Sequence, residues 1–296
     1  MDFIALAPDP GIDEMSKVAY YVFIITTPFS ILFSFFIIWT FFKYKECKIQ
    51  PGDLMLGISI SDFFLSIHWL VSALFSHHGP FKHVIKDMKT SMFCKINAIF
   101  STGAGVNSFL YNASFCICII MMIRKPLAHT EKKYKKYFHF INVTAVIIFV
   151  LIYQFQSKLG LNALGTCSVK EPSVTSVFPI LIYICLSGYT IYYLKKIMKN
   201  QTQEEKNPII NNYIKYIIFT VVTWSIICSS WTYSEWIKNM DIDHNMGLTI
   251  FIFSLGNIAK IGSSLALSYY ARFKDPTFRP KIEEKCPCLK AKKKIE

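Results

Sequence analysis

The sequence lacks the short motifs that mark common enzyme classes. Neither H-E-x-x-H, which places two zinc-binding histidines on one helix face, nor G-x-S-x-G, which carries a hydrolase serine, occurs in its 296 residues. Few histidines fall in the apolar segments, which argues against haem held by paired histidines. We therefore expect a protein that is not an enzyme and that holds no metal.

Two further absences concern the organisation of the chain. The first three apolar segments do not echo the last three, which argues against a transporter built from repeats. The first 17 residues carry four carboxylates and one lysine, whereas a cleavable signal peptide begins basic and then turns apolar. We expect residues 1–17 to form an extracellular stub that is too short to bind a ligand by itself.

Apolar residues are in excess, and they gather in long blocks. Hydrophobic residues make up 53% of the chain and its mean hydropathy is +0.36, which is high for a soluble domain. Each block has about the 20 residues that a helix needs to cross a bilayer, where a helix satisfies its own backbone groups. The sequence therefore predicts an all-α, seven-transmembrane helix bundle over residues 18–270. The predicted helices are Val18–Phe42, Leu54–Phe75, Phe93–Met122, Phe138–Phe155, Val174–Leu194, Tyr216–Trp236 and Met246–Tyr270.

Basic residues are distributed unevenly between the two sides of this bundle. The net charge is +13, but only seven Lys or Arg fall on the side of the N-terminus, whereas 23 fall on the other side. The positive-inside rule places the N-terminus outside and the C-terminus in the cytoplasm. The charge thus predicts a topology and contact with anionic membrane lipids, and no nucleic acid partner. We expect a multi-pass protein of the plasma or ciliary membrane.

The same topology sorts the nine cysteines. Only Cys94, at the start of helix three, and Cys167, in the loop after helix four, face the oxidising side. We predict a disulfide between them that holds this loop across the mouth of the bundle. Two free buried thiols are the alternative.

Ionisable residues at membrane depth are costly and therefore suggest function. Asp62 lies in helix two and Lys260 near the middle of helix seven, and their opposite charges make them natural partners as an ion pair or a switch. A lysine in helix seven also allows a retinal Schiff base. Helix three, however, carries no carboxylate to act as the counter-ion, which argues against a retinal photoreceptor. This class is therefore kept only as an alternative.

The tail, residues 271–296, begins with a short amphipathic segment. Ala271–Arg279 mixes basic and aromatic residues and is expected to lie along the membrane surface. Cys286 and Cys288 follow, and their cytoplasmic position near the membrane makes them candidates for S-palmitoylation. A zinc site is the rival interpretation, but no further cysteine or histidine lies nearby.

Together these features resemble the G-protein-coupled receptor superfamily. Within it, the stretch Ser-Phe-Leu-Tyr-Asn-Ala at 108–113 is similar to the Ser-Phe-Leu-Trp-Thr-Ala of class E, the cyclic-AMP receptor-like family. Residues 59–67 of helix two, and Gly262 and Tyr269 of helix seven, also fit that family. The chain departs from it at Leu265, where many members carry Asn. The Asp-Arg-Tyr of rhodopsin-like receptors is absent too, and in this respect the chain resembles class E receptors.

The resemblance implies a receptor that binds a small extracellular ligand and activates a heterotrimeric G protein. Arg124 and Lys125, at the inner end of helix three, would meet the G protein. Asp62, Lys260, Trp224 and Tyr269 would form the intramembrane switch, with Trp224 as a rotamer pivot, although plain packing explains Trp224 equally well. The competing class is a small-solute transporter or channel, which would show solute flux without nucleotide exchange.

Overall fold

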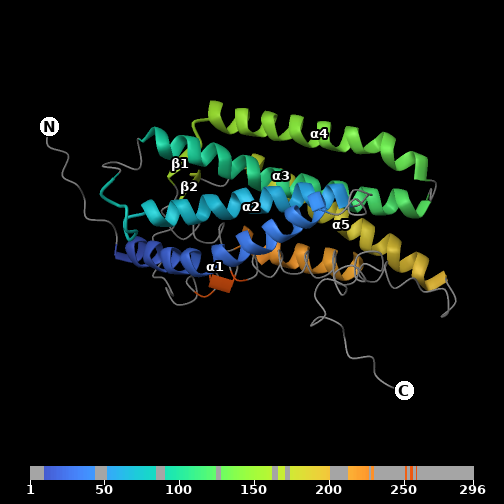
Figure 1. Ribbon diagram of the computed structural model, residues 1–296, viewed down its shortest axis with the longest axis horizontal. Coiled ribbons are helices and arrows are strands. Elements are labelled where there is room, and N and C mark those ends of the chain that lie inside the picture. Colours follow the sequence, from blue (N-terminus) through green and yellow to red (C-terminus); the bar gives the residue numbers. More distant parts are fainter. Residues whose placement is uncertain are drawn as a thin grey trace, which may run out of the picture.

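The structure is a computed structural model, and six helices account for nearly all of its described part. It describes residues 10–43, 52–84, 91–124, 128–161, 166–170, 174–200, 213–226, 228–229, 251, 254–255 and 258. The labelled elements in Figure 1 are α1 (Pro10–Lys43), α2 (Gly52–Phe75), α3 (Met92–Arg124), α4 (Ala128–Phe155), β1 (Leu159–Leu161), β2 (Cys167–Val169) and α5 (Val174–Asn200). A sixth helix, Tyr213–Ile226, follows.

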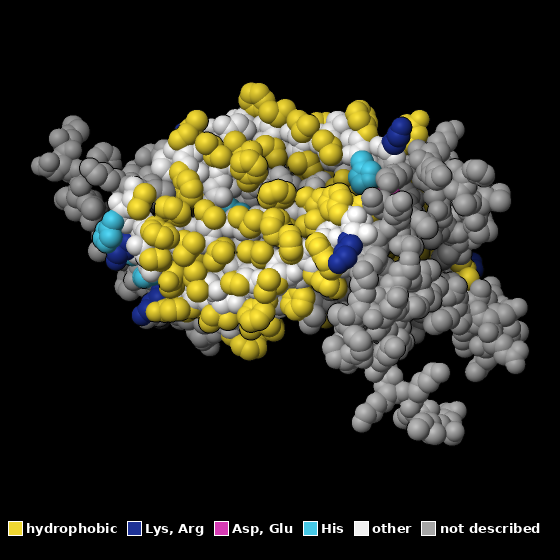
Figure 2. Space-filling view, in the orientation of Figure 1, with side chains coloured by type: hydrophobic (Ala, Val, Ile, Leu, Met, Phe, Trp, Pro, Cys, Tyr) yellow, Lys and Arg dark blue, Asp and Glu magenta, His cyan; other side chains and the backbone are white. Residues whose placement is uncertain are grey.

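Five of these helices, α1 to α5, are long and apolar enough to cross a membrane. Figure 2 shows hydrophobic side chains over the middle of the molecule, with the basic side chains of this face towards its two ends. Large apolar residues such as Leu32, Phe140 and Leu181 are exposed on α1, α4 and α5. The chain is therefore a multi-pass α-helical membrane protein, with lipid as the solvent for this apolar belt.

Helix α3 is the centre of the arrangement. It contacts α2, α4, α5 and both strands, whereas α1 packs against α2, and Figure 1 shows α3 between α4 and α2. In the most apolar 18-residue stretch of α3, 67% of the residues are buried, compared with 11% in the corresponding stretch of α4. The main core accordingly consists mostly of residues from α2, α3, α5 and the sixth helix, including Ile58, Phe115 and Ile217, and Ile37 of α1 joins it.

The helices extend beyond the predicted apolar blocks. Helix α1 begins at Pro10 rather than Val18, α4 at Ala128 rather than Phe138, and α5 continues to Asn200. The added ends are polar, and Lys and Glu are good helix formers. The apolar block thus marks the stretch inside the lipid, and the helix continues into water. The predicted seventh helix lies outside the described residues except at a few positions, so the seven-helix count stays a prediction.

The short hairpin of β1 and β2 was not predicted. Its strands pair antiparallel, with Gly160 opposite Ser168. Leu159 and Val169 pack with Ala98 of α3 and Tyr153 of α4, so the hairpin covers the N-terminal end of α3 and the C-terminal end of α4. The side chain of Lys170 occupies the space that a Cβ on Gly160 would need. That flexible side chain could move aside, but Gly160 has a φ of 157°, a backbone conformation that residues with a side chain rarely adopt, so glycine is favoured there.

Candidate functional site

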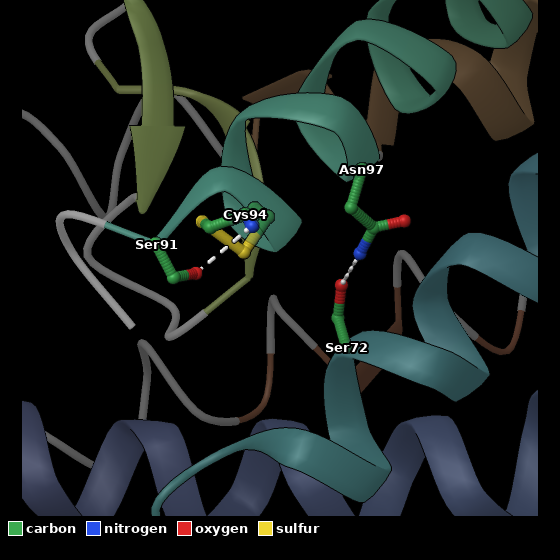
Figure 3. Close-up of a disulfide and its surroundings, with 5 residues drawn as sticks. Ser72, Ser91, Cys94 and Asn97 are labelled. Carbon is green, nitrogen blue, oxygen red and sulfur yellow. Dashed lines mark hydrogen bonds between the residues drawn. A yellow bond between two sulfur atoms is a disulfide. The ribbon is translucent and has the colours of Figure 1, made fainter. Parts of the chain in front are cut away.

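Hydrogen bonds between side chains join α2 to α3 at successive depths. Near the N-terminal end of α3 the Asn97 amide donates to the Ser72 hydroxyl at 3.0 Å (Figure 3). Deeper in the bundle the Asn107 amide donates to Ser61 at 2.8 Å. Such bonds between helices hold helix pairs together in lipid, where little hydrophobic force acts between them. The α2–α3 interface is therefore a fixed frame for the rest of the bundle.

A disulfide fastens the N-terminal end of α3. Cys94 is bonded to Cys167 of β2, as the topology predicted, and both side chains are fully buried. Ser91, just before the helix, accepts a hydrogen bond from the Cys94 backbone N–H at 3.1 Å and so caps the helix. Figure 3 shows the cap and the disulfide on the same turn. The hairpin is thereby held at the top of α3.

A polar network lies at the middle depth of the bundle. The carboxylate of Asp62 accepts a hydrogen bond from the Ser108 hydroxyl at 3.0 Å. One turn further along α3, the Asn112 amide donates to the Ser108 carbonyl at 2.8 Å, and its oxygen accepts from the Tyr216 hydroxyl at 3.0 Å. The network thus connects α2, α3 and the sixth helix through buried side chains.

A second contact extends the network to α5. The hydroxyls of Tyr183, on α5, and Thr220, on the sixth helix, lie 2.5 Å apart. Thr220 also donates to the Tyr216 carbonyl at 3.1 Å. All three side chains are buried. A movement of the sixth helix relative to α3 or α5 would therefore have to break or exchange these hydrogen bonds.

Trp224 lies on the outer side of this network, against an aromatic neighbour. Its ring centroid is 4.4 Å from that of Phe109, and Phe109 is 6.2 Å from Tyr183. Rings of α3, α5 and the sixth helix thus pack together two helical turns from Tyr216. A change in the Trp224 rotamer would displace Phe109, so the aromatic cluster couples the outer half of the bundle to the polar network.

Helix α4 is attached to α3 by polar pairs in its inner half. The Tyr111 hydroxyl lies 2.8 Å from Nδ1 of His139, and about one turn further along α3 the Ser114 hydroxyl donates to the Asn142 amide oxygen at 3.0 Å. The Tyr111 ring fills the space beside Gly57 of α2. Tyr111 therefore links three helices.

The predicted site residues divide into two groups. Asp62 and Trp224 are both buried and lie at the network and at the aromatic cluster, respectively. Arg124 is the last residue of α3. The remaining predicted residues, Lys125, Lys260, Tyr269, Cys286 and Cys288, lie outside the described residues, as does any contact between Asp62 and Lys260.

Sequence reasoning missed most members of the network, namely Ser108, Asn112, Tyr183, Tyr216 and Thr220. One signal was present. Ser108 and Asn112 stand four residues apart in an apolar helix, so they lie on one face, and buried polar groups need partners. The identity of those partners depends on how the helices are rotated, which one sequence does not specify.

Compared with protein families and with curated proteins, the chain matches none of them. The structure itself supports the class stated above, a multi-pass α-helical membrane protein with a disulfide at one end of the bundle and a buried polar network.

Proposed function

We propose that this protein is a G-protein-coupled receptor that senses a small extracellular ligand. The observation that carries the proposal is the chain of hydrogen bonds from Asp62 to Tyr216, which joins α2, α3 and the sixth helix at the centre of the bundle. A receptor needs an element with two discrete arrangements that a ligand can bias. Buried hydrogen bonds between helices, which exchange rather than stretch, supply such an element.

In this mechanism the ligand acts in the outer half of the bundle. The disulfide holds the hairpin and the outer end of α3 in place, so α3 is the static part. The sixth helix, which contacts α3 through Trp224 and Tyr216, is the part that moves. A ligand that displaces Trp224 or Phe109 would favour the arrangement in which Tyr216 leaves Asn112. The inner ends of the helices would then separate.

The cytoplasmic side would receive the G protein. In this arrangement the end of α3 at Arg124 would lie on that side, and α4 and α5 carry lysines beyond their membrane spans. These positive charges suit the acidic surface of a partner. Arg124 and Lys125, with the inner ends of α5 and the sixth helix, would form the contact.

The test is guanine-nucleotide exchange on heterotrimeric G proteins, in membranes that contain the chain and display its N-terminus at the surface. We expect exchange above that of membranes lacking the chain, and Tyr216→Phe, which removes the hydroxyl that binds Asn112, should change its basal level. Tyr192→Phe is the matched control because Tyr192 is exposed on α5. Stimulation by cyclic AMP would identify the ligand. Solute flux with no exchange under any condition would contradict the proposal.

A further inference from the structure

The last two turns of α5 are strongly basic. Lys195, Lys196 and Lys199 are all exposed, whereas the 27 residues of α5 include no Asp or Glu. The apolar span of this helix is Phe178–Ile197, so two of the lysines stand at the end of the span and the third lies just beyond it. Figure 1 shows this end of α5 on the same side of the molecule as the C-terminal end of α3 and the N-terminal end of α4. Long basic side chains at such a position extend to the membrane interface, where the lipid headgroups lie.

The three lysines point away from the helix bundle. Leu194 is fully buried and belongs to the main core, together with residues of α3 and the sixth helix, so it marks the side of α5 that packs inward. Successive residues of an α-helix are turned by about 100°. Lys195, Lys199 and Lys196 therefore lie about 100°, 140° and 160° around the helix from Leu194. Their charges face the surrounding headgroups rather than the core between α5 and its neighbours.

A gap in the row of side chains lies on the same face of α5, further into the membrane. Gly188 is exposed, and no atom of the described residues comes within 4 Å of where its Cβ would stand. It precedes Lys195 by seven residues, or about 10 Å, and residues at this spacing share one face of a helix. Cys185, one turn earlier, is also small and exposed. Beside the gap, Tyr189 and Tyr193 are stacked with ring centroids 6.3 Å apart and form a firm aromatic surface.

We propose that the outward face of α5 binds one anionic phospholipid, with its headgroup on Lys195, Lys196 and Lys199 and an acyl chain beside Gly188. The ammonium groups of lysine attract phosphate and carboxylate oxygens, and basic clusters at the cytoplasmic ends of membrane helices suit the anionic lipids of that leaflet. A chain that enters the gap gains van der Waals contacts on several sides. The overall charge of the chain predicts a general attraction to anionic lipids, whereas this face of α5 supplies one particular site.

The depth of the gap favours a lipid over a soluble acidic partner. Gly188 lies inside the apolar span, nine residues or about 13 Å before its end at Ile197. A soluble protein or nucleotide could reach the lysines from water, but it would not reach this depth. An uncharged lipid could enter the gap, but it would leave the lysines unused. An anionic phospholipid carries charge at the interface and a chain in the hydrocarbon, so it uses both features.

The test measures which lipids the purified full-length protein retains in detergent. Native mass spectrometry compares phosphatidylserine with phosphatidylcholine, which has no net charge. The variant Lys195→Gln/Lys199→Gln removes two charges from this face of α5. The matched control, Lys136→Gln/Lys215→Gln, removes two exposed lysines near the same membrane surface, on α4 and on the sixth helix. We expect the first variant to retain about tenfold less phosphatidylserine, because each basic residue adds a several-fold attraction, and the control to resemble the unaltered protein. Equal losses in the two variants would show unspecific attraction and overturn the site.

A second variant tests the gap beside the lysines. Gly188→Leu places a good helix former in open space, so it should not lower the midpoint of thermal unfolding. We expect it to reduce phosphatidylserine retention by about threefold, because the added side chain takes the place of the acyl chain. Val143→Leu, at an exposed position on α4, is the control and should leave retention unchanged. Full retention in Gly188→Leu would mean that surface charge alone holds the lipid, and it would overturn the site.

The lipid site and the proposed receptor function can fail separately. Lipid retention is measured without any G protein, and nucleotide exchange is measured without reference to a bound lipid. Retention that follows these variants in a protein without nucleotide exchange would support the site and contradict the receptor function. Exchange in a protein that retains phosphatidylserine no better than phosphatidylcholine would support the receptor function and overturn the site.

Discussion

At the scale of single residues, two glycines give opposite predictions for the same substitution. A Cβ on Gly57 would lie 2.6 Å from Cζ of Tyr111, whose hydroxyl contacts His139, so the ring cannot easily move away. We expect Gly57→Ala to lower the free energy of unfolding by about 1–3 kcal/mol, as overpacking does. Thermal unfolding in detergent measures the effect. Gly103→Ala is the control, because its Cβ would lie an ordinary 3.7 Å from Val150. Equal loss in both variants would contradict this account of Tyr111.

Residues whose importance follows from local composition could be predicted, and those that depend on helix rotation could not. Asp62 stands out as a carboxylate in an apolar segment, and Cys94 and Cys167 stand out because they are the two cysteines that the topology predicted from the sequence would place outside. The Asn112–Tyr216 hydrogen bond joins residues 104 positions apart. It requires α3 and the sixth helix to turn particular faces toward each other.

At the scale of elements, the hairpin and α4 depend on different anchors. The disulfide and the Lys170 N–H, which donates to the Lys158 carbonyl at 2.8 Å, hold the hairpin. The inner half of α4 is held by Tyr111 and Ser114. We expect Cys94→Ser to speed hydrogen exchange in the hairpin while leaving the inner half of α4 protected, as measured by exchange mass spectrometry. Cys185→Ser, at an exposed free cysteine on α5, should change neither. Loss of protection throughout α4 would show that the disulfide supports the whole helix pair.

The sequence indicated the elements better than their ends. Apolar blocks located the membrane-crossing part of α1 to α5, because lipid demands about 20 apolar residues wherever a helix crosses. The lysine-rich start of α4 and end of α5 were predicted to be loops, although the structure shows them as helix. Charged residues indicate that a stretch lies in water, but they do not indicate that the helix has ended. The hairpin was missed because three-residue strands leave almost no periodic pattern.

At the scale of the whole molecule, the number of crossings decides where the two ends lie. Seven spans place the N-terminus and the C-terminus on opposite sides, whereas six place them on the same side. The excess of basic residues on the side of the C-terminus favours seven. We expect an N-terminal epitope tag to bind antibody on intact cells, and a C-terminal tag to bind only after permeabilisation. Both tags accessible on intact cells would contradict the predicted topology.

The peripheral position of α4 has an evolutionary consequence. Most of its surface faces lipid, and its fit to α3 rests on a few contacts such as Tyr111–His139 and Ser114–Asn142. Selection on the outward residues then requires little more than that they stay apolar, so exchanges among Ile, Val, Leu and Phe accumulate freely there. Descendants of a common ancestor would come to differ in α4 long before they differ at the α2–α3 interface, where each hydrogen bond constrains two residues at once. Sequence similarity between such relatives would therefore persist longest at the paired positions inside the bundle and would be lost first on the surface that faces the lipid.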